Sequence, residues 1–333
     1  MTILKKFIFG ILLIISILLV TNFFLNVKEL KTFKKYEELV KTNPNDAEAC
    51  FELGICYEEG IGTDIDKNKA YECYKKSTEL DDKNAEYWCI LGYCYQLGRG
   101  TDLDGIKAFE CYKKANELDE TNAIYWDLLG LCYNYGIGTS KDKEQLYNCY
   151  KKATELDENV AAYWHNLGDF YKTEANEFDE TMKSWIDSVM DSEKESKYDQ
   201  NKAYESYKKA YECYKKANEL NKTDASSWYE LGYCYDNGKG IEVDDKKAFE
   251  CYKKATKLDK KDAFYWYSLG CCYEKGVGTK IDERKAFKCY KKATELDEKN
   301  GIYWYNLGFC YEKGKGTKID EKKANECFNK ARM

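Results

Sequence analysis

Proline and histidine are almost absent from this chain, which has one of each in 333 residues. Proline breaks helices because it lacks a backbone N–H and its ring collides with the preceding turn, so its near absence permits almost continuous helix. With His165 as the single histidine and no Cys-x-x-Cys pair, a zinc site lacks its usual ligand spacing. The sequence therefore predicts no metal and no other cofactor.

An excess of basic charge is missing as well. The chain has 53 Lys and Arg against 59 Asp and Glu, a net charge of −6. Nucleic-acid-binding proteins need a basic footprint, so nucleic acid is not an expected partner. Charged residues make up 34% of the chain and are mixed in sign, which is typical of solvated helix faces.

Catalytic patterns are also lacking. The chain has no paired carboxylates at a distinctive spacing and no nucleophile elbow. Ser206-Tyr-Lys-Lys209 fits Ser-x-x-Lys, but a lysine-rich helix produces this spacing by chance, and no companion motif is present. We therefore expect no enzyme and assign no catalytic residue.

What the chain does have is a Leu-Gly pair that recurs at one fixed spacing, the spacing from Gly54 to Gly92. One step is longer, from Gly168 to Gly232, and it amounts to the same period plus an insertion. Seven copies at a fixed period indicate a stacked array of supersecondary units. The glycines of the pairs are Gly54, Gly92, Gly130, Gly168, Gly232, Gly270 and Gly308.

Each repeat reads as a helix hairpin. In the second copy, Trp88, Leu91, Gly92 and Tyr95 share one helix face, and Gly92 would let a second helix approach closely. After a Gly-x-Gly turn, Asp104 stands where a helix N-cap is expected. This acid recurs at Asp66, Asp104, Asp142, Asp244, Asp282 and Asp320. A Gly-x-Gly between two helices, with no strand before it, favours turn geometry over phosphate binding.

These motifs resemble two related families. The Trp/Leu-Gly/Tyr and Ala/Tyr/Ala spacing resembles tetratricopeptide repeats, and the longer Gly-x-Gly-Thr-x-x-Asp-x-x-Lys-Ala turn resembles Sel1-like repeats, over Tyr36–Met333. The resemblance implies an all-α, right-handed α-solenoid of seven hairpins that binds proteins or peptides as a scaffold or adaptor. The chain departs from the pattern at its single Pro44 and in the turn of the fourth copy.

An apolar run, Phe7–Leu25, follows Lys5-Lys6 and is long enough to span a bilayer. No Ala-x-Ala-like cleavage site follows it, so residues 1–27 are expected to form an uncleaved, single-pass membrane anchor. Lysines on both sides leave the side of the repeat domain open, cytosolic or extracytoplasmic.

The remaining chain divides by its repeats. Residues 28–46 are expected to form a linker and capping half-repeat, and 47–171 the first three repeats with part of the fourth. Residues 172–201 form an amphipathic insertion, which either packs back on the array, docks a partner or acts as a hinge. Residues 202–333 complete the array, and the outer face of its final helix is a candidate surface for self-association.

Thirteen of the sixteen cysteines follow the repeat. Two interpretations stay open: reduced, buried thiols that fill the core as small apolar residues, or disulfide staples in an exported domain. The first helices hold Cys56, Cys94, Cys132, Cys234, Cys272 and Cys310. The second helices hold Cys73, Cys111, Cys149, Cys213, Cys251, Cys289 and Cys327.

Three positions of the first helix vary freely among the copies: two before the leucine of the Leu-Gly pair, one after its glycine and four after its glycine. They lie on one helix stripe, which lines the concave groove in tetratricopeptide folds. We expect this aromatic and acidic stripe to bind a segment with apolar anchors and some Lys or Arg, although it could be an ordinary solvated face. The predicted site is Phe51, Ile55, Tyr93, Asp127, Leu131, His165, Asp169, Tyr229, Tyr233, Asp236, Tyr267, Glu274, Tyr305, Phe309 and Glu312.

The sequence thus favours a membrane-anchored scaffold that binds proteins or peptides. The alternatives are a cell-envelope spacer without a specific ligand, or a cysteine-rich secreted-type Sel1-like protein with a hydrolase-like or host-interaction role.

Overall fold

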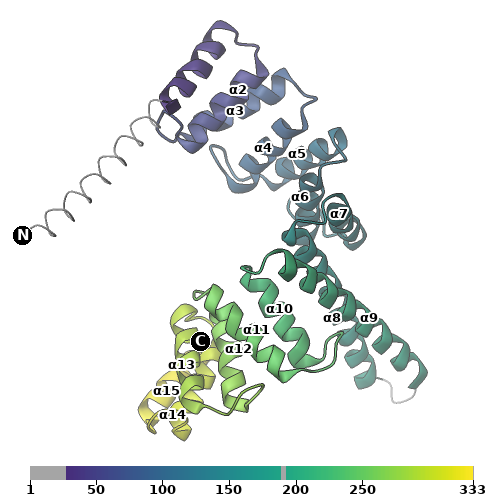
Figure 1. Cartoon of the computed structure of the whole chain (residues 1–333), viewed down its shortest axis with the longest axis vertical. Coiled ribbons are helices and arrows are strands. Elements are labelled where there is room, and N and C mark those ends of the chain that lie inside the picture. Colours follow the sequence, from purple (N-terminus) through teal and green to yellow (C-terminus); the bar gives the residue numbers. More distant parts are fainter. Residues whose placement is uncertain (1–27, 189–192, 333) are drawn as a thin grey trace, which may run out of the picture. The chain divides into compact units, whose positions relative to one another are not determined.

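A computed structural model describes residues 28–188 and 193–332 as helices joined by short turns, with no strand in these ranges. The chain divides into two compact units, residues 1–156 and 157–333, which are considered separately (Figure 1). The division falls between the third and fourth repeats. The membrane anchor expected over residues 1–27 lies outside the described residues.

The first unit contains a helix over residues 28–42 and three hairpins. The hairpins pair α2 (Ala47–Glu59) with α3 (Lys67–Leu80), α4 (Ala85–Leu97) with α5 (Gly105–Leu118), and α6 (Ala123–Tyr135) with α7 (Lys143–Leu156). The helix over 28–42 packs on α2 through an edge-to-face contact of Phe33 with Tyr57, 5.5 Å between ring centroids. Phe109 of α5 makes the same contact with Tyr133 of α6.

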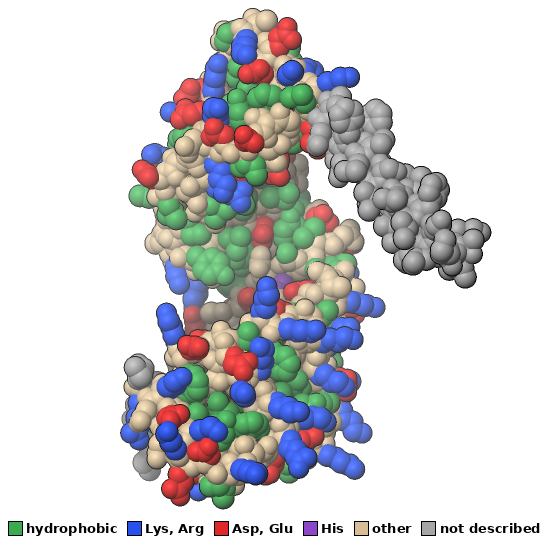
Figure 2. Space-filling model, turned by 90° about the vertical axis from the view of Figure 1, so that its left-hand side faces the viewer, with side chains coloured by type: hydrophobic (Ala, Val, Ile, Leu, Met, Phe, Trp, Pro, Cys, Tyr) green, Lys and Arg blue, Asp and Glu red, His purple; other side chains and the backbone are tan. Residues whose placement is uncertain are grey.

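The second unit contains four hairpins. They pair α8 (Ala161–Ser188) with α9 (Glu193–Leu220), α10 (Ala225–Asn237) with α11 (Asp245–Leu258), α12 (Ala263–Lys275) with α13 (Glu283–Leu296), and α14 (Gly301–Lys313) with α15 (Glu321–Ala331). The seven hairpins confirm the all-α repeat array that the fixed period predicts. On the surface, positive and negative side chains are interspersed (Figure 2).

The insertion does not form a segment of its own. Residues 172–188 and 193–201 extend α8 and α9 to 28 residues each, whereas the other first and second helices have at most 14. The boundaries expected at residues 171 and 201 therefore fall inside helices. Ala175, Ala203 and Tyr207 are buried between the two helices, and the Tyr207 hydroxyl donates to Asp179 at 2.8 Å. The apolar pattern from Met182 to Met190 lies outside the side chains that the structure describes.

The glycine of each Leu-Gly pair holds the crossing point of its hairpin. A Cβ built on Gly92 would lie 2.8 Å from the ring of Tyr112, a buried residue of α5. The same contact recurs in all seven repeats, with Phe328 as the aromatic residue in the last. The expected close approach of the second helix is therefore confirmed. The aromatic ring that recurs in the second helix fills the space beside the glycine.

The expected N-caps are also present. The Asp104 carboxylate accepts a hydrogen bond from the Lys107 backbone N–H at 3.0 Å, and the equivalent acid does so in all six repeats that carry it. These backbone hydrogen bonds lower the pKa of Asp104. The first helices also have N-caps, which the sequence analysis did not predict. Asn84, for example, accepts a hydrogen bond from the Glu86 backbone N–H at 3.0 Å.

The two glycines of each Gly-x-Gly turn act differently. Gly98 ends α4 in the left-handed conformation, with φ of 62°, as expected of a helix C-cap. Gly100 also has a positive φ, 71°, but a Cβ there would lie 2.0 Å from the carbonyl oxygen of Lys67 in the preceding repeat. The second glycine is therefore a contact between repeats, as well as part of a turn.

Candidate functional site

The first position of the predicted stripe serves mainly to pack one repeat on the next. The Tyr229 ring lies 5.4 Å from Tyr252 of its own hairpin and 5.3 Å from Tyr265 of the next, and the residue is only 8% exposed. Phe51 is buried in the same way. These two rings stabilise the array and present little surface to a ligand.

Tyr267 and Tyr305 occupy the same position with increasing exposure. Tyr267 is half-buried, with its ring 5.1 Å from Tyr303 of the next repeat. Tyr305 is 58% exposed, and Phe328 of its own hairpin is the ring it contacts, at 5.7 Å. The difference arises because no described residue covers α14 where a following repeat would pack.

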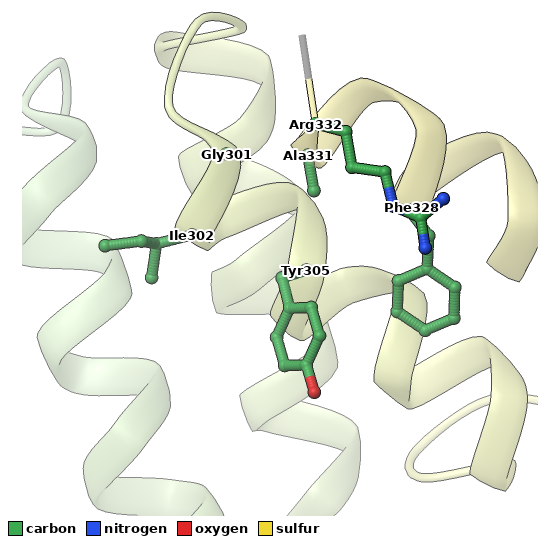
Figure 3. Close-up of a pocket in the computed structure, with 6 residues that line it drawn as sticks. All are labelled: Gly301, Ile302, Tyr305, Phe328, Ala331 and Arg332. Atoms are coloured by element: carbon green, nitrogen blue, oxygen red, sulfur yellow. The ribbon is translucent and has the colours of Figure 1, made fainter.

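An open hollow of about 600 Å³ therefore lies beside Tyr305 (Figure 3). Gly301, Ile302 and Tyr305 line it from α14, and Phe328, Ala331 and Arg332 line it from α15 and its end. The lining residues from α15 belong to the final helix, whose outer face the sequence predicts as a surface for self-association.

The acids of the stripe already have partners within the array. Glu58 accepts hydrogen bonds from the Tyr74 hydroxyl at 2.8 Å and from Arg99 of the next repeat at 2.7 Å. Burial raises the pKa of Tyr74, and its hydrogen bond to Glu58 raises it further, so the phenol remains the donor. Glu58 thereby joins its own hairpin to the turn of the following repeat.

The same arrangement recurs in the second unit. Glu274 accepts from the Tyr290 hydroxyl at 2.7 Å and from Lys315 at 3.2 Å, while Asp236 accepts from the Tyr252 hydroxyl at 3.2 Å. Glu58 and Glu274 are therefore each compensated by a cation of the next repeat, whereas Asp236 is hydrogen-bonded by a neutral hydroxyl. Glu312, in the last repeat, is exposed and pairs with its neighbour Lys313.

The middle position of the stripe has the same intermediate exposure throughout the array. Its residues are half-buried in every repeat: Ile55, Tyr93, Leu131, Asp169, Tyr233, Cys271 and Phe309. Three of the side chains are aromatic, and each has a cation over its ring. The cations are Arg99, 4.8 Å from the centroid of Tyr93, Lys172, 5.4 Å from that of Tyr233, and Lys315, 4.9 Å from that of Phe309.

The junction between the fourth and fifth repeats has polar contacts in addition to an edge-to-face contact of Tyr211 with Tyr235, 5.7 Å between ring centroids. His165 Nδ1 lies 3.2 Å from the Ser227 hydroxyl, which donates to Asp224. Ser227 occupies the repeat position that Tyr265 has in the sixth repeat. The sequence alone shows this difference between the two repeats. Half-buried Asp127, in the third repeat, completes the first-position residues of the predicted site.

A buried ion pair lies at the same junction. Lys172 Nζ is 2.6 Å from Glu230 Oε2, and both side chains are mostly buried. Burial raises the pKa of Glu230, against the opposing effect of Lys172. On the adjoining turn of α8, the Asp169 carboxylate accepts a hydrogen bond from the Tyr214 hydroxyl of α9 at 2.7 Å. The fourth repeat is thus joined to the fifth by hydrogen bonds and charge.

The cysteines lie in the described part of the chain, and all sixteen are free thiols. Fourteen are buried, and Cys73 and Cys271 are half-buried. Burial raises the pKa of Cys132 to about 12 and that of Cys73 to about 11, so little reactive thiolate forms near neutral pH.

We expect most thiols of the folded protein to resist a small disulfide reagent at pH 8. Cys73 and Cys271 should react first, and the others only after unfolding, because the thiolate is the reactive species and burial disfavours it. Counting released chromophore in native and denaturing buffer, with and without prior reduction, tests this. Thiols that appear only after reduction would instead establish disulfide staples.

Among the side chains that the structure describes, no three of His, Cys, Asp or Glu are grouped to hold a metal ion. Over residues 28–188 and 193–332 there is also no helix of the length and apolar character needed to cross a membrane.

Comparison with known proteins identifies the class of repeat. The family model described as Sel1 repeat matches 47–82, 89–120, 128–158, 197–222, 226–260, 256–271, 267–298 and 305–333, more than half of the chain. The chain therefore belongs to the Sel1 repeat family. Such arrays are typically non-catalytic scaffolds that mediate protein interactions. A search of curated proteins finds no match.

Two of the solved structures that are similar to this chain have Sel1-type folds. A protective antigen present in uropathogenic Escherichia coli strains, which displays an SLR fold, aligns over 90% of this chain with 24% identity and a TM-score of 0.64. This chain spans only 56% of the antigen's length. A Sel1 repeat protein from Oxalobacter formigenes aligns over 83% of this chain and 98% of its own, with 26% identity and a TM-score of 0.57.

Proposed function

We propose that this protein is a scaffold that binds a protein or peptide segment along the first-helix stripe of residues 157–333. The observation that carries the proposal is the set of aromatic rings there that are not fully buried, half-buried Tyr233 and Phe309 at the middle position and exposed Tyr305 beyond them. Aromatic side chains commonly dominate the binding energy of such surfaces, because they bury large area with little loss of entropy.

The charges of this surface are largely paired within the array. Lys172, over the ring of Tyr233, is paired with Glu230, and Lys315, over the ring of Phe309, is paired with Glu274. The apolar anchors of a bound segment therefore contribute more to recognition by this stripe than its flanking charges do.

A peptide library screened against the full chain, followed by binding titrations of the best peptide, tests this. We expect Tyr233→Ala and Phe309→Ala each to weaken binding by about tenfold or more, as loss of a hot-spot ring does. Tyr204→Ala, which removes a ring that is 48% exposed on the second helix α9, is the matched control and should leave binding unchanged. Equal loss in all three variants, or no peptide bound at all, would favour a spacer without a ligand.

We further propose that Phe7–Leu25 anchors the scaffold in a membrane. The support is the length and apolar character of this run in the sequence. The thiol labelling described above, carried out in intact and then in lysed cells, also reports the side of the membrane. Thiols reached only after lysis would place the repeats inside the cell.

A further inference from the structure

A group of lysines lies on the exposed side of the helix over residues 28–42. All four lysines of residues 28–35 are exposed, and the single acid of this stretch, Glu29, is half-buried. We call these four residues the lysine cluster: Lys28, Lys31, Lys34 and Lys35. The last three of them line an open hollow of about 490 Å³ together with Glu38, Leu39 and Thr42, so the lining contains three cations and one acid.

The opposite side of this helix fixes its orientation on the first repeat. The ring of Phe33 contacts that of Tyr57 edge to face. A Cβ built on Gly62 would lie 2.6 Å from Leu30 Cα, so the backbone of the helix packs directly on the first Gly-x-Gly turn. Because these contacts occupy one side of the helix, the lysine cluster faces away from the repeat.

Local helix energetics do not explain the lysine cluster. Lys31 lies one helical turn from each of the other three lysines, and like charges at this spacing destabilise a helix. Among the described residues no carboxylate forms an ion pair with the cluster: Glu37 pairs with Lys41 at 3.1 Å, and Lys35 Nζ lies 4.6 Å from the centroid of the Tyr36 ring. Second-helix lysines of the same unit do have an acid one turn further on. These pairs are Lys75–Glu79, Lys113–Glu117 and Lys151–Glu155.

The position of the lysine cluster in the chain indicates which anion it meets. The apolar run Phe7–Leu25 ends three residues before Lys28. Three residues span at most about 10 Å, and a helix advances about 10 Å from Lys28 to Lys35. The proposed membrane anchor, on which this inference rests, therefore holds the cluster at the bilayer surface. Anionic lipids attract lysines there over a Debye length of about 8–10 Å.

We infer that the lysine cluster binds the headgroups of anionic phospholipids in the membrane that holds the anchor. The ammonium groups donate charge-assisted hydrogen bonds to the phosphate oxygens. The negative headgroups also offset the repulsion among the lysines, which no described carboxylate of the chain does. Because the helix is packed on the first repeat through Phe33, this binding holds the first repeat beside the membrane surface.

Lysine acetylation of the full chain in lipid nanodiscs tests the inference. One set of discs contains phosphatidylcholine alone, and the other contains an equal mixture of phosphatidylcholine and phosphatidylglycerol. A water-soluble active ester acetylates exposed amines, and mass spectrometry gives the rate at each lysine. We expect Lys31, Lys34 and Lys35 to react about fivefold more slowly in the anionic discs, because an anionic surface attracts each nearby lysine by about 1 kcal/mol. High salt should remove the difference, because it screens the surface charge.

Matched controls separate the lysine cluster from general effects of charge. Lys113 and Lys253, on exposed positions of second helices, should react equally in both kinds of disc. K34E/K35E should abolish the slowing at Lys31, because the cluster then carries more acids than lysines. K34R/K35R keeps the charge and should keep the slowing, as should K113E/K253E. Circular dichroism should show unchanged helicity in all variants, because every substituted residue is exposed.

The outcomes distinguish this inference from the proposed anchor. Elution of the chain with neutral discs, with equal acetylation of Lys31 in both kinds of disc, overturns the inference and supports the anchor. Elution with anionic discs alone, with Lys31 slowed, supports the inference and overturns the anchor. A chain that elutes with neither kind of disc overturns both. Equal slowing at Lys31, Lys113 and Lys253, or slowing that persists in K34E/K35E, also overturns the inference.

Discussion

Gly100→Ala should lower the free energy of unfolding of the first unit by about 3 kcal/mol. Two costs add: an alanine at φ of 71° is strained by about 1–2 kcal/mol, and forcing a methyl into a packed site typically costs about 1–3 kcal/mol. The new Cβ would lie 2.0 Å from the Lys67 carbonyl oxygen and 2.9 Å from Tyr71 Cβ. Because the first contact is with backbone of the preceding repeat, the two repeats must separate to make room.

Gly98→Ala is the matched control. Gly98 has a similar φ, 62°, but a Cβ there would meet its neighbours at 3.4 Å or more, which is ordinary contact. We expect it to cost about 1 kcal/mol, from strain alone. Urea unfolding followed by circular dichroism, with hydrogen exchange to locate the loss, measures both. Equal losses in the two variants would mean that the second glycine of the turn is not a contact between repeats.

Tyr229→Ala should also destabilise the protein strongly, by about 3 kcal/mol, although a first-helix stripe position would suggest a role in binding. Its ring is almost fully buried against Tyr252, Phe264 and Tyr265, so truncation leaves a cavity between two repeats. Large-to-small changes of buried aromatic residues typically cost about 3–5 kcal/mol.

Tyr305→Ala makes the same change at the same repeat position where the ring is 58% exposed. We expect it to cost less than about 1 kcal/mol, as exposed substitutions usually do. Thermal and urea unfolding of both variants of the full chain give the comparison. If Tyr305→Ala proves as costly as Tyr229→Ala, then burial between repeats is not what Tyr229 contributes. The pair also explains why Tyr229 is unsuitable for testing ligand binding.

Much of the fold could be predicted from the sequence by itself. The period indicated the hairpin unit, its seven copies and the turn positions, because helical spacing and turn chemistry are local properties. The glycine of each Leu-Gly pair predicted the close helix crossing, and Asp104 and its equivalents predicted the N-caps. Each of these features depends on residues within one repeat, so the sequence of a single repeat contains it.

Only the tertiary structure decided which side chains of neighbouring repeats contact one another. The periodic pattern puts Tyr229, Tyr233 and Asp236 on one stripe. In the structure, the neighbouring repeat buries Tyr229 but leaves Tyr233 half-buried. Asp236 accepts a hydrogen bond from a hydroxyl of the second helix. Likewise, the insertion has helical spacing, yet it lengthens two existing helices instead of adding one. The physical reason is that periodicity specifies the face of a helix on which a side chain lies. It does not specify which atoms from another repeat cover that face.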